Sequence, residues 1–504
     1  MSQDQEFTLP PVRPLTEATE AVIALLDRAM VPQKGATHEE LRQIRDALRE
    51  PVRIAVAGRV NAGKSTLVNA LVGQIVAPTD VSECTKMVTW YRYGTPQRLE
   101  IVMHDGSRRR ERLGPTGRLP SELGVDHAEV RWLEAWLAND RLRSMTLIDT
   151  PGLGSLNADY SAVAEDFLTT NQASTKATSV ADAIVFILNT EIRADEAAAV
   201  RSFRESSGGP GGAAGNAIGV LSKADKLAPG SGWWDAAQRL AKRLAYQLQD
   251  EVVTVVPVVG LIAETTESAQ LTQGDSGKLA ELAAMDPASL DLLQLSASRF
   301  TSGESPVSAE DRVRLLKLLD LQGISVAVDL IRDGGVSGAT ALRRALSERA
   351  GIEELRSLIT DTFRGKGEAL KIRSALQNIE RLCFAPPDDA DLPMIQVLAD
   401  DTERLRLAPV LHQLAETEAF MLWTSGAVAL PAELSGDLIR MTTGLTPAER
   451  LGASSDAVRE LRQAALDGSA RWHGLLLAAS PGQARIARVM WRSYALAYEQ
   501  AGGR

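Results

Sequence analysis

An apolar run that passes into a glycine-bounded turn constrains this chain more than any other feature. Residues 52–57 are almost all apolar, and Gly58, Gly63, Lys64 and Ser65 then meet the spacing G-x-x-x-x-G-K-S. Glycines at these places let successive backbone N–H groups point at phosphate oxygens, and the following helix adds the positive end of its dipole. The pattern therefore predicts a strand, a phosphate-binding loop and a helix, in that order.

Within this loop, Lys64 is expected to reach the β and γ phosphates of a nucleotide, and Ser65 to ligate the Mg²⁺ ion that bridges them. A further apolar strand is predicted over 142–152 and ends in the sequence D-T-P-G. Asp149 in that sequence can hold the Mg²⁺ shell through water, and Gly152 can donate its N–H to the γ phosphate. These signals follow the first loop in the order that a triphosphate site requires.

Thr85 lies between these two motifs, in an irregular segment that leads into a β-rich stretch. Its hydroxyl and carbonyl are expected to close over Mg²⁺ and the γ phosphate, so that the segment is ordered only when triphosphate is bound. Thr79, Ser82 and Thr89 are nearby alternatives for this role. The remaining possibility is that Thr85 is an ordinary turn residue before a strand.

A third strand is predicted to end in the sequence S-K-A-D at 222–225. Asp225 can accept hydrogen bonds from both N1–H and the 2-amino group of guanine, while the stem of Lys223 lies across the base. Adenine offers no such pair of donors, so the motif favours GTP. The β-like run that follows ends at Gly260, whose backbone can contact the base. The predicted nucleotide contacts are Gly58, Asn61, Ala62, Gly63, Lys64, Ser65, Thr66, Asp149, Gly152, Lys223, Asp225 and Gly260, with Ser65, Thr85 and Asp149 as Mg²⁺ ligands and Lys64, Thr85 and Gly152 as catalytic groups.

Length and composition set the wider limits. A chain of 504 residues is expected to form more than one domain. The two cysteines, Cys84 and Cys383, form no metal or redox pattern, and the net charge of −10 argues against broad nucleic-acid binding. The amino terminus does not resemble a signal peptide, and no apolar run reaches the roughly 20 residues that span a bilayer. We therefore expect a cytoplasmic protein whose membrane contact, if any, is peripheral.

The order of the predicted elements divides the chain into three parts. Helices within 1–50 are expected to join a bundle formed by 366–504, because their apolar faces have no other obvious partner. Residues 51–365 are expected to form an α/β P-loop domain with a mostly parallel sheet and helices on both faces, carrying a helical insertion at about 276–348. Residues 97–104 are expected to form one strand of a hairpin, and the basic run at 107–112 a solvated loop.

The motifs G58-R-V-N-A-G-K-S-T-L-V-N-A-L-V-G73, Thr85, D149-T-P-G152 and S222-K-A-D225 together resemble those of bacterial dynamin-like GTPases. The stretch from Gly63 to Arg92 is similar to the isoniazid-inducible dynamin-like GTPases of mycobacteria, especially the shorter member without a transmembrane segment. The resemblance implies an enzyme that hydrolyses GTP to GDP and phosphate in a head domain. It also implies a helical neck and trunk that meet lipid, peripherally at the inner face of the cell membrane, and pairing of two heads or with a paralogous dynamin-like partner.

One position departs from the resemblance. Eukaryotic dynamins carry a glutamine that helps to position the attacking water, and this chain has Val60 at that place. An apolar side chain cannot orient water, so backbone groups near Gly152, Thr85 or residues of a paired head would have to do so. Two other functions stay open: a GTP-binding assembly subunit for a paralogous partner, and a ribosome- or RNA-associated GTPase, which would need a basic RNA-binding module.

Lipid contact requires exposed apolar or aromatic residues at a turn of the helical bundle. The sequence Phe420, Met421, Leu422 and Trp423 runs into an uncharged turn at 424–428 and is the favoured place. The stretch that begins at Trp472 is the second. The alternative for both is that these side chains pack in the core of the bundle.

Overall fold

The computed structural model describes residues 14–30, 36–78, 87–114, 117–120, 123–151, 181–190, 216–227, 232–248, 251–360, 367–384, 391–424, 428–476 and 479–502. The chain divides into two compact units. The sheet unit comprises Arg53–Phe203 and Ala217–Asp361, and the helical unit comprises Met1–Val52, Arg204–Asn216 and Thr362–Arg504.

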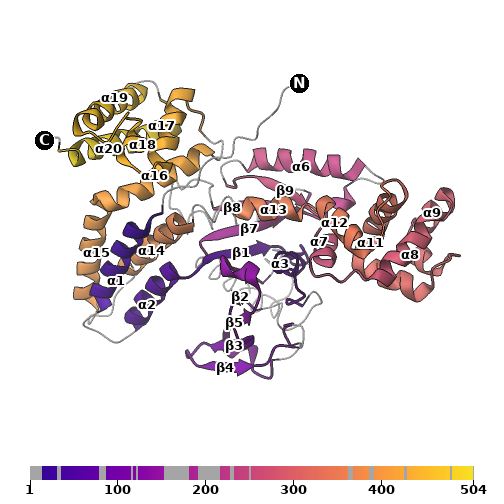
Figure 1. Ribbon diagram of the computed structural model, residues 1–504. Helices are drawn as coiled ribbons and strands as arrows, with labels where there is room; N and C mark the ends of the chain where they lie inside the picture. The colour runs from indigo at the N-terminus through magenta and orange to yellow at the C-terminus, as the bar shows by residue number, and fades with distance from the viewer. Residues whose placement is uncertain are drawn as a thin grey trace. The chain divides into compact units, whose positions relative to one another are not determined.

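One mixed sheet forms the centre of the sheet unit (Figure 1). Its central strands are parallel, because β1 pairs with β7, β7 with β8 and β8 with β9 in that sense. Every residue of β1 and β7 is buried, as expected for parallel strands covered on both faces. In spatial order the strands are β4 (Arg108–Glu111), β3 (Arg98–Met103), β5 (Val130–Leu137), β2 (Thr89–Tyr93), β6 (Met145–Asp149), β1 (Val52–Gly58), β7 (Ala183–Leu188), β8 (Ala217–Ser222) and β9 (Val255–Val258).

Two helices position the central strands. Helix α6 (Trp233–Gln247) places Ala241 and Leu244 in a core cluster with residues of β1, β7 and β8. Helix α3 (Lys64–Val72) packs against α7 (Gly260–Glu267), which begins directly after β9. The carboxyl ends of β1 and β8 and the start of α3 are thereby fixed by apolar packing.

The outer strands correct one prediction and bear out another. The basic run is exposed to solvent, as expected, but it is not a loop, because it contains strand β4, which pairs with β3. Strand β3 does form a hairpin, but with β4, and β5 separates it from β2. Arg108 of β4 pairs with two buried carboxylates, and its Nη1 atom lies 3.1 Å from both Glu100 Oε2 and Glu134 Oε2. These acids face each other across β3 and β5 and require cationic partners.

A chain of helices follows α7 in the sheet unit. It consists of α8 (Gln273–Ala283), α9 (Pro287–Leu293), α10 (Ala297–Ser302), α11 (Ala309–Arg332), α12 (Ala339–Arg349) and α13 (Ile352–Ile359). Side chains of Thr272, Asp286, Ser296 and Ser308 cap α8 to α11 by accepting backbone N–H bonds. Helix α11 is kinked at Asp320, whose φ of 56° and ψ of 175° are not helical. The sequence predictions contain no break at this position.

Two apolar clusters hold the helical unit together. The first joins α1 (Thr16–Met30), α2 (Ala36–Arg49), α14 (Gly367–Phe384), α15 (Leu392–Leu407) and α16 (Pro409–Thr424). The second joins the end of α16 with α17 (Ala432–Thr443), α18 (Pro447–Leu451), α19 (Val458–Leu476) and α20 (Pro481–Gln500) around Trp472 and Tyr494. Among the residues described, no helix is long and apolar enough to cross a bilayer.

Phe420 belongs to the second cluster, and the other expected lipid-contacting residues follow it at the end of α16. Phe420 and Met421 are only 3% and 2% exposed, and Leu422 and Trp423 pack against the same cluster. Trp472 is fully buried. The prediction of an exposed apolar turn is therefore wrong for Phe420 and Met421, because a helix end with neighbours on several sides buries its bulky residues.

Candidate nucleotide-binding site

The phosphate-binding loop joins β1 to α3 and depends on left-handed backbone. Gly58, Asn61 and Gly63 have φ values of 154°, 60° and 98°. A Cβ atom at Gly58 would lie 3.0 Å from the carbonyl oxygen of Ile187 on β7, so the loop needs glycine there for space as well as for conformation. Helix α3 then begins at Lys64, with its first backbone N–H groups at the mouth of the loop.

Lys64 is held inside this loop. Its side chain donates from Nζ to the carbonyl of Arg59 at 2.9 Å, and the residue is 9% exposed. Burial lowers the pKa of Lys64, and the nearby charge of Asp149 partly offsets this effect. A buried ammonium bonded to the loop backbone is already in place to bind an anion, and phosphate is the anion that this loop fits.

Ser65 and Asp149 meet at the neighbouring strand end. Ser65 Oγ donates to Asp149 Oδ2 at 3.0 Å, and Asp149 is the last residue of β6. Burial raises the pKa of Asp149 to about 6, although Lys64 and Ser65 act in the opposite direction. Its Oδ1 atom is buried without a hydrogen-bond partner in the described part of the chain. A hydroxyl and a buried carboxylate with an unused oxygen suit a hard divalent cation such as Mg²⁺, which would offset phosphate charge when bound.

The S-K-A-D segment is bonded to the phosphate-binding loop. Ser222 Oγ donates to the carbonyl of Ala62 at 2.7 Å, and Lys223 Nζ donates to the carbonyl of Asn61 at 2.8 Å. Lys223 has a positive φ of 54° and precedes the short helix η4 (Ala224–Lys226). Burial raises the pKa of Asp225 within η4. Two segments far apart in sequence are thus held side by side.

The other predicted contacts divide into two groups. Gly260 is the first residue of α7 and lies against α3, since a Cβ atom there would be 3.4 Å from Thr66 Cγ2. Its contact with a base stays a prediction. Thr85 and Gly152, with Thr79 and Ser82, lie outside the described residues. Thr89 is a buried residue of β2 opposite Asp149 in the β2–β6 ladder.

A polar network behind α3 has no counterpart in the sequence predictions. Asn69 is fully buried, accepts from the backbone N–H groups of Val76 and Ala77, and donates to Ala77 and to Glu264 on α7. Burial raises the pKa of Glu264 to about 6, although the Asn69 bond lowers it. The asparagine thereby fixes the chain where it leaves α3. In the sequence, the only indication of this role is that Asn69 lies within the helix predicted after the loop.

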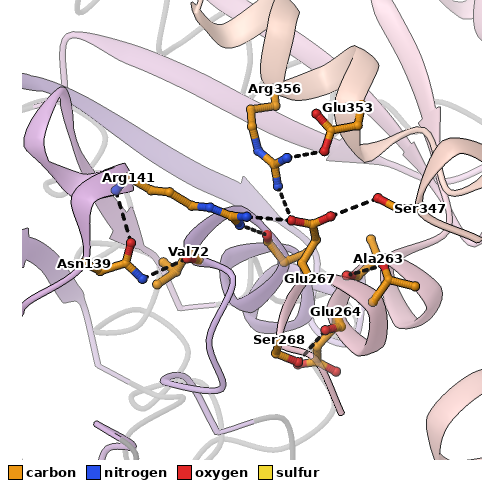
Figure 2. Close-up of polar contacts among 12 residues, drawn as sticks. Val72, Asn139, Arg141, Ala263, Glu264, Glu267, Ser268, Ser347, Glu353 and Arg356 are labelled. Carbon is orange, nitrogen blue, oxygen red and sulfur yellow. Dashed lines mark hydrogen bonds and ion pairs between the residues drawn. The ribbon is translucent and has the colours of Figure 1, made fainter. Parts of the chain in front are cut away.

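Glu267 lies one helical turn after Glu264 on α7 and is the centre of a second group of polar contacts (Figure 2). Its carboxylate lies 2.8 Å from Arg141 Nη2, 2.7 Å from Arg356 Nη2 and 2.9 Å from Ser347 Oγ. Asn139, near Arg141, donates to the carbonyl of Val72 at the end of α3. Helix α7 therefore ties the phosphate-loop helix to α12, α13 and the segment before β6.

Replacing Glu267 by alanine is expected to destabilise the sheet unit by about 2–4 kcal/mol, because two half-buried guanidinium groups lose their shared partner. Burial alone would raise the pKa of Glu267, but Ser347 and Arg356, with Arg141, hold it below the usual value of 4.5. The stabilisation is therefore present above pH 4.5 and lost as the pH falls through the lower folded value. Urea denaturation at pH 7 and pH 4 measures both effects. Glu353→Ala is the control, because Glu353 is exposed and, within the described part of the chain, pairs with one of the same two arginines, Arg356. Equal stability of the two variants at pH 7 would contradict the expectation.

Comparisons with known proteins agree with this geometry. A family model described as 50S ribosome-binding GTPase matches residues 53–210. The isoniazid-induced protein IniC of Mycobacterium tuberculosis is 34% identical over 450 residues, which cover 87% of this chain and 88% of IniC. The bacterial dynamin-like protein of Nostoc punctiforme is 43% identical over 54 residues, 11% of this chain and 8% of that protein.

Among solved structures, an oligomerised bacterial dynamin pair is described as providing a mechanism for the long range sensing and tethering of membranes. It aligns with 100% of this chain and 92% of its own, at 14% identity and a TM-score of 0.33. That score is too low to support an inference about this chain.

Proposed function

Because this chain belongs to the IniC family of dynamin-like GTPases, we propose that binding and hydrolysis of GTP drive the pairing of two sheet units and thereby remodel or maintain a membrane. The main observation in support of GTP binding is that the side chains of Ser222 and Lys223 donate hydrogen bonds to the carbonyls of Ala62 and Asn61. These two bonds join the S-K-A-D segment to the loop between β1 and α3, which supports the assignment of a guanine site next to a phosphate site. We place the protein at the inner face of the cell membrane as a peripheral protein.

The residues of the site have separate tasks in this proposal. Lys64 stabilises negative charge on the β and γ phosphates, and the backbone N–H groups from Gly58 to the start of α3 bind their oxygens. Ser65 would hold Mg²⁺ directly and Asp149 would hold it through water, and the ion would offset phosphate charge, while Asp225 binds the base edge. Thr85 and Gly152 are proposed to complete the site around the γ phosphate.

A second candidate is a GTPase that turns over slowly alone and acts as an assembly subunit with a paralogous dynamin-like partner. Val60 favours it, because this apolar side chain lies in the phosphate-binding loop and is 58% exposed. An exposed valine at the mouth of the site cannot hold a water molecule, but it can contact a protein surface. A ribosome-associated role, which the name of the matching family model suggests, has less support from a chain with a net charge of −10.

Assembly and membrane contact can be tested together. With a non-hydrolysable GTP analogue and Mg²⁺, the wild-type chain is expected to double its mass in light scattering and to sediment with anionic vesicles, whereas GDP leaves it monomeric. The physical reason is that a bound triphosphate adds charge and contacts at the nucleotide face that GDP lacks. Lys64→Ala is the matched control. An unchanged mass and no sedimentation in either state would reject the membrane part, and assembly only after a paralogue is added would support the second candidate.

A further inference from the structure

A strained residue in α11 lies next to the base motif. Asp320 has a φ of 56° and a ψ of 175° inside an otherwise helical segment. This region of backbone space is almost confined to glycine, so a residue with a Cβ atom stays there only when its surroundings hold it. Such residues gather where ligands bind, which makes the contacts of Asp320 informative.

Contacts with α7 maintain the kink. Thr265 Oγ1 donates to the carbonyl of Leu318 at 2.6 Å, and Asp320 Oδ1 accepts from the backbone N–H of Leu321 at 2.8 Å. Both contacts satisfy backbone groups at the interruption of the helix. Gly323 lets α11 approach α7 closely, because a Cβ atom there would lie 3.1 Å from Ile262 Cγ1. The kink is therefore a built feature of the fold.

The kinked segment packs against η4, the short helix that contains Asp225. Asp320 Oδ2 lies 3.6 Å from Lys226 Nζ, and Lys226 directly follows Asp225. Besides burial, which is the larger effect, the negative charge of Asp320 raises the pKa of Asp225, while Lys226 and Lys223 lower it. The carboxylates of Asp225 and Asp320, which are distant in sequence, thus both contribute negative charge to the segment around η4.

We propose that Asp320 is a specificity-determining residue of the guanine site, where its carboxylate, in an ion pair with Lys226, adds a second negative charge to the loop that holds Asp225. This inference rests on the proposed assignment of Asp225 to the base edge. Guanine presents two hydrogen-bond donors there, N1–H and the 2-amino group, and a negative field favours both. Xanthine replaces the 2-amino donor by a carbonyl acceptor, which the same field repels. Asp320 therefore increases the preference for GTP over xanthosine triphosphate.

The alternative hypothesis is that Asp320 only maintains the kink that lets α11 follow α7. Two substitutions distinguish this hypothesis from a role in base specificity. Asp320→Asn removes the charge but keeps an acceptor oxygen for the N–H of Leu321, and it leaves the backbone strain at this position as in the wild type. Asp320→Gly removes both the charge and the strain. Ala269→Gly is the matched control for strain, because Ala269 also has a positive φ, of 55°, at the end of α7.

The test measures the dissociation constants of GTP and xanthosine triphosphate for the full chain, together with melting temperatures. We expect Asp320→Asn to lower the preference for GTP by about threefold to tenfold, a modest effect because the carboxylate is half-exposed. Asp320→Gly should lower it equally while the melting temperature rises by about 2–4 °C. Ala269→Gly should raise the melting temperature and leave the preference unchanged.

The Asp225→Asn variant separates two kinds of failure. If Asp225→Asn loses its preference for GTP while Asp320→Asn keeps the wild-type preference, the role of Asp320 is overturned and the base site stands. If neither substitution changes the preference, the assignment of Asp225 fails and the inference about Asp320 fails with it.

Discussion

Replacing Lys64 by alanine is expected to lower kcat/KM for GTP by about 10²–10³-fold, the loss typical of a preorganised charged donor removed from a transition state. The melting temperature should stay the same or rise. Burial lowers the pKa of Lys64, which means that the folded protein disfavours its charged form. Removing a desolvated charge therefore relieves a cost to folding while it deletes the group that binds phosphate. Steady-state phosphate release and thermal denaturation measure the two effects.

The control for this prediction is Lys278→Ala. Lys278 belongs to the same unit, but it is on the surface of α8 and its ammonium pairs with Glu281 at 3.1 Å. Its removal should leave turnover unchanged. Unchanged turnover in Lys64→Ala itself would show that the loop after β1 is not the phosphate site.

Local patterns predicted the parts of the site that are continuous in sequence. The apolar run before Gly58 requires a strand buried on both faces, and glycines at two fixed places allow the loop that follows. Lys64 and Ser65 then lie at the start of a helix because the spacing leaves no other arrangement. The predicted membership of the chain in a GTPase family is confirmed. It could be predicted because the motifs of that family are short and contiguous in sequence.

Pairings between distant segments could not be predicted in this way. The basic run around Arg108 has the composition of a solvated loop, and its pairing with β3 and with the buried acids Glu100 and Glu134 is visible only in the structure. The same holds for Glu267, an unremarkable glutamate in a helical pattern whose arginine partners come from two other elements. Sequence periodicity gives the type of an element but not its neighbours, so buried polar networks appear only in three dimensions.

The kink at Asp320 illustrates a further limit. An aspartate followed by a glycine three residues later fits an ordinary helix, and the residues around it are apolar at helical spacing. What breaks the helix is the hydroxyl of Thr265, which takes a carbonyl from the helical ladder. Strain of this kind costs about 1–3 kcal/mol and is decided by tertiary contacts.

Replacing Asp225 by asparagine is expected to weaken GTP binding by roughly 10²–10⁴-fold and to shift the preference towards xanthosine triphosphate. Two charge-assisted hydrogen bonds to guanine are lost, each contributing about 1.5–3 kcal/mol, and the new amide brings a donor against the donors of the base. Because burial raises the pKa of Asp225, ionisation of this group opposes folding at neutral pH, and the neutral asparagine should not lower the melting temperature.

The same raised pKa gives GTP affinity a pH dependence with a definite sign. The carboxylate must be ionised to accept both guanine bonds, so affinity should fall as the pH decreases towards the raised value. Asp225→Asn should remove this part of the dependence and leave the part that comes from Asp149, whose pKa is also raised by burial. Isothermal titration between pH 5 and pH 8 measures it, with the exposed Asp235 of α6 changed to asparagine as the charge-matched control. Wild-type protein that binds ATP as tightly as GTP would contradict the role of Asp225, because adenine lacks the two donors that its carboxylate is placed to bind.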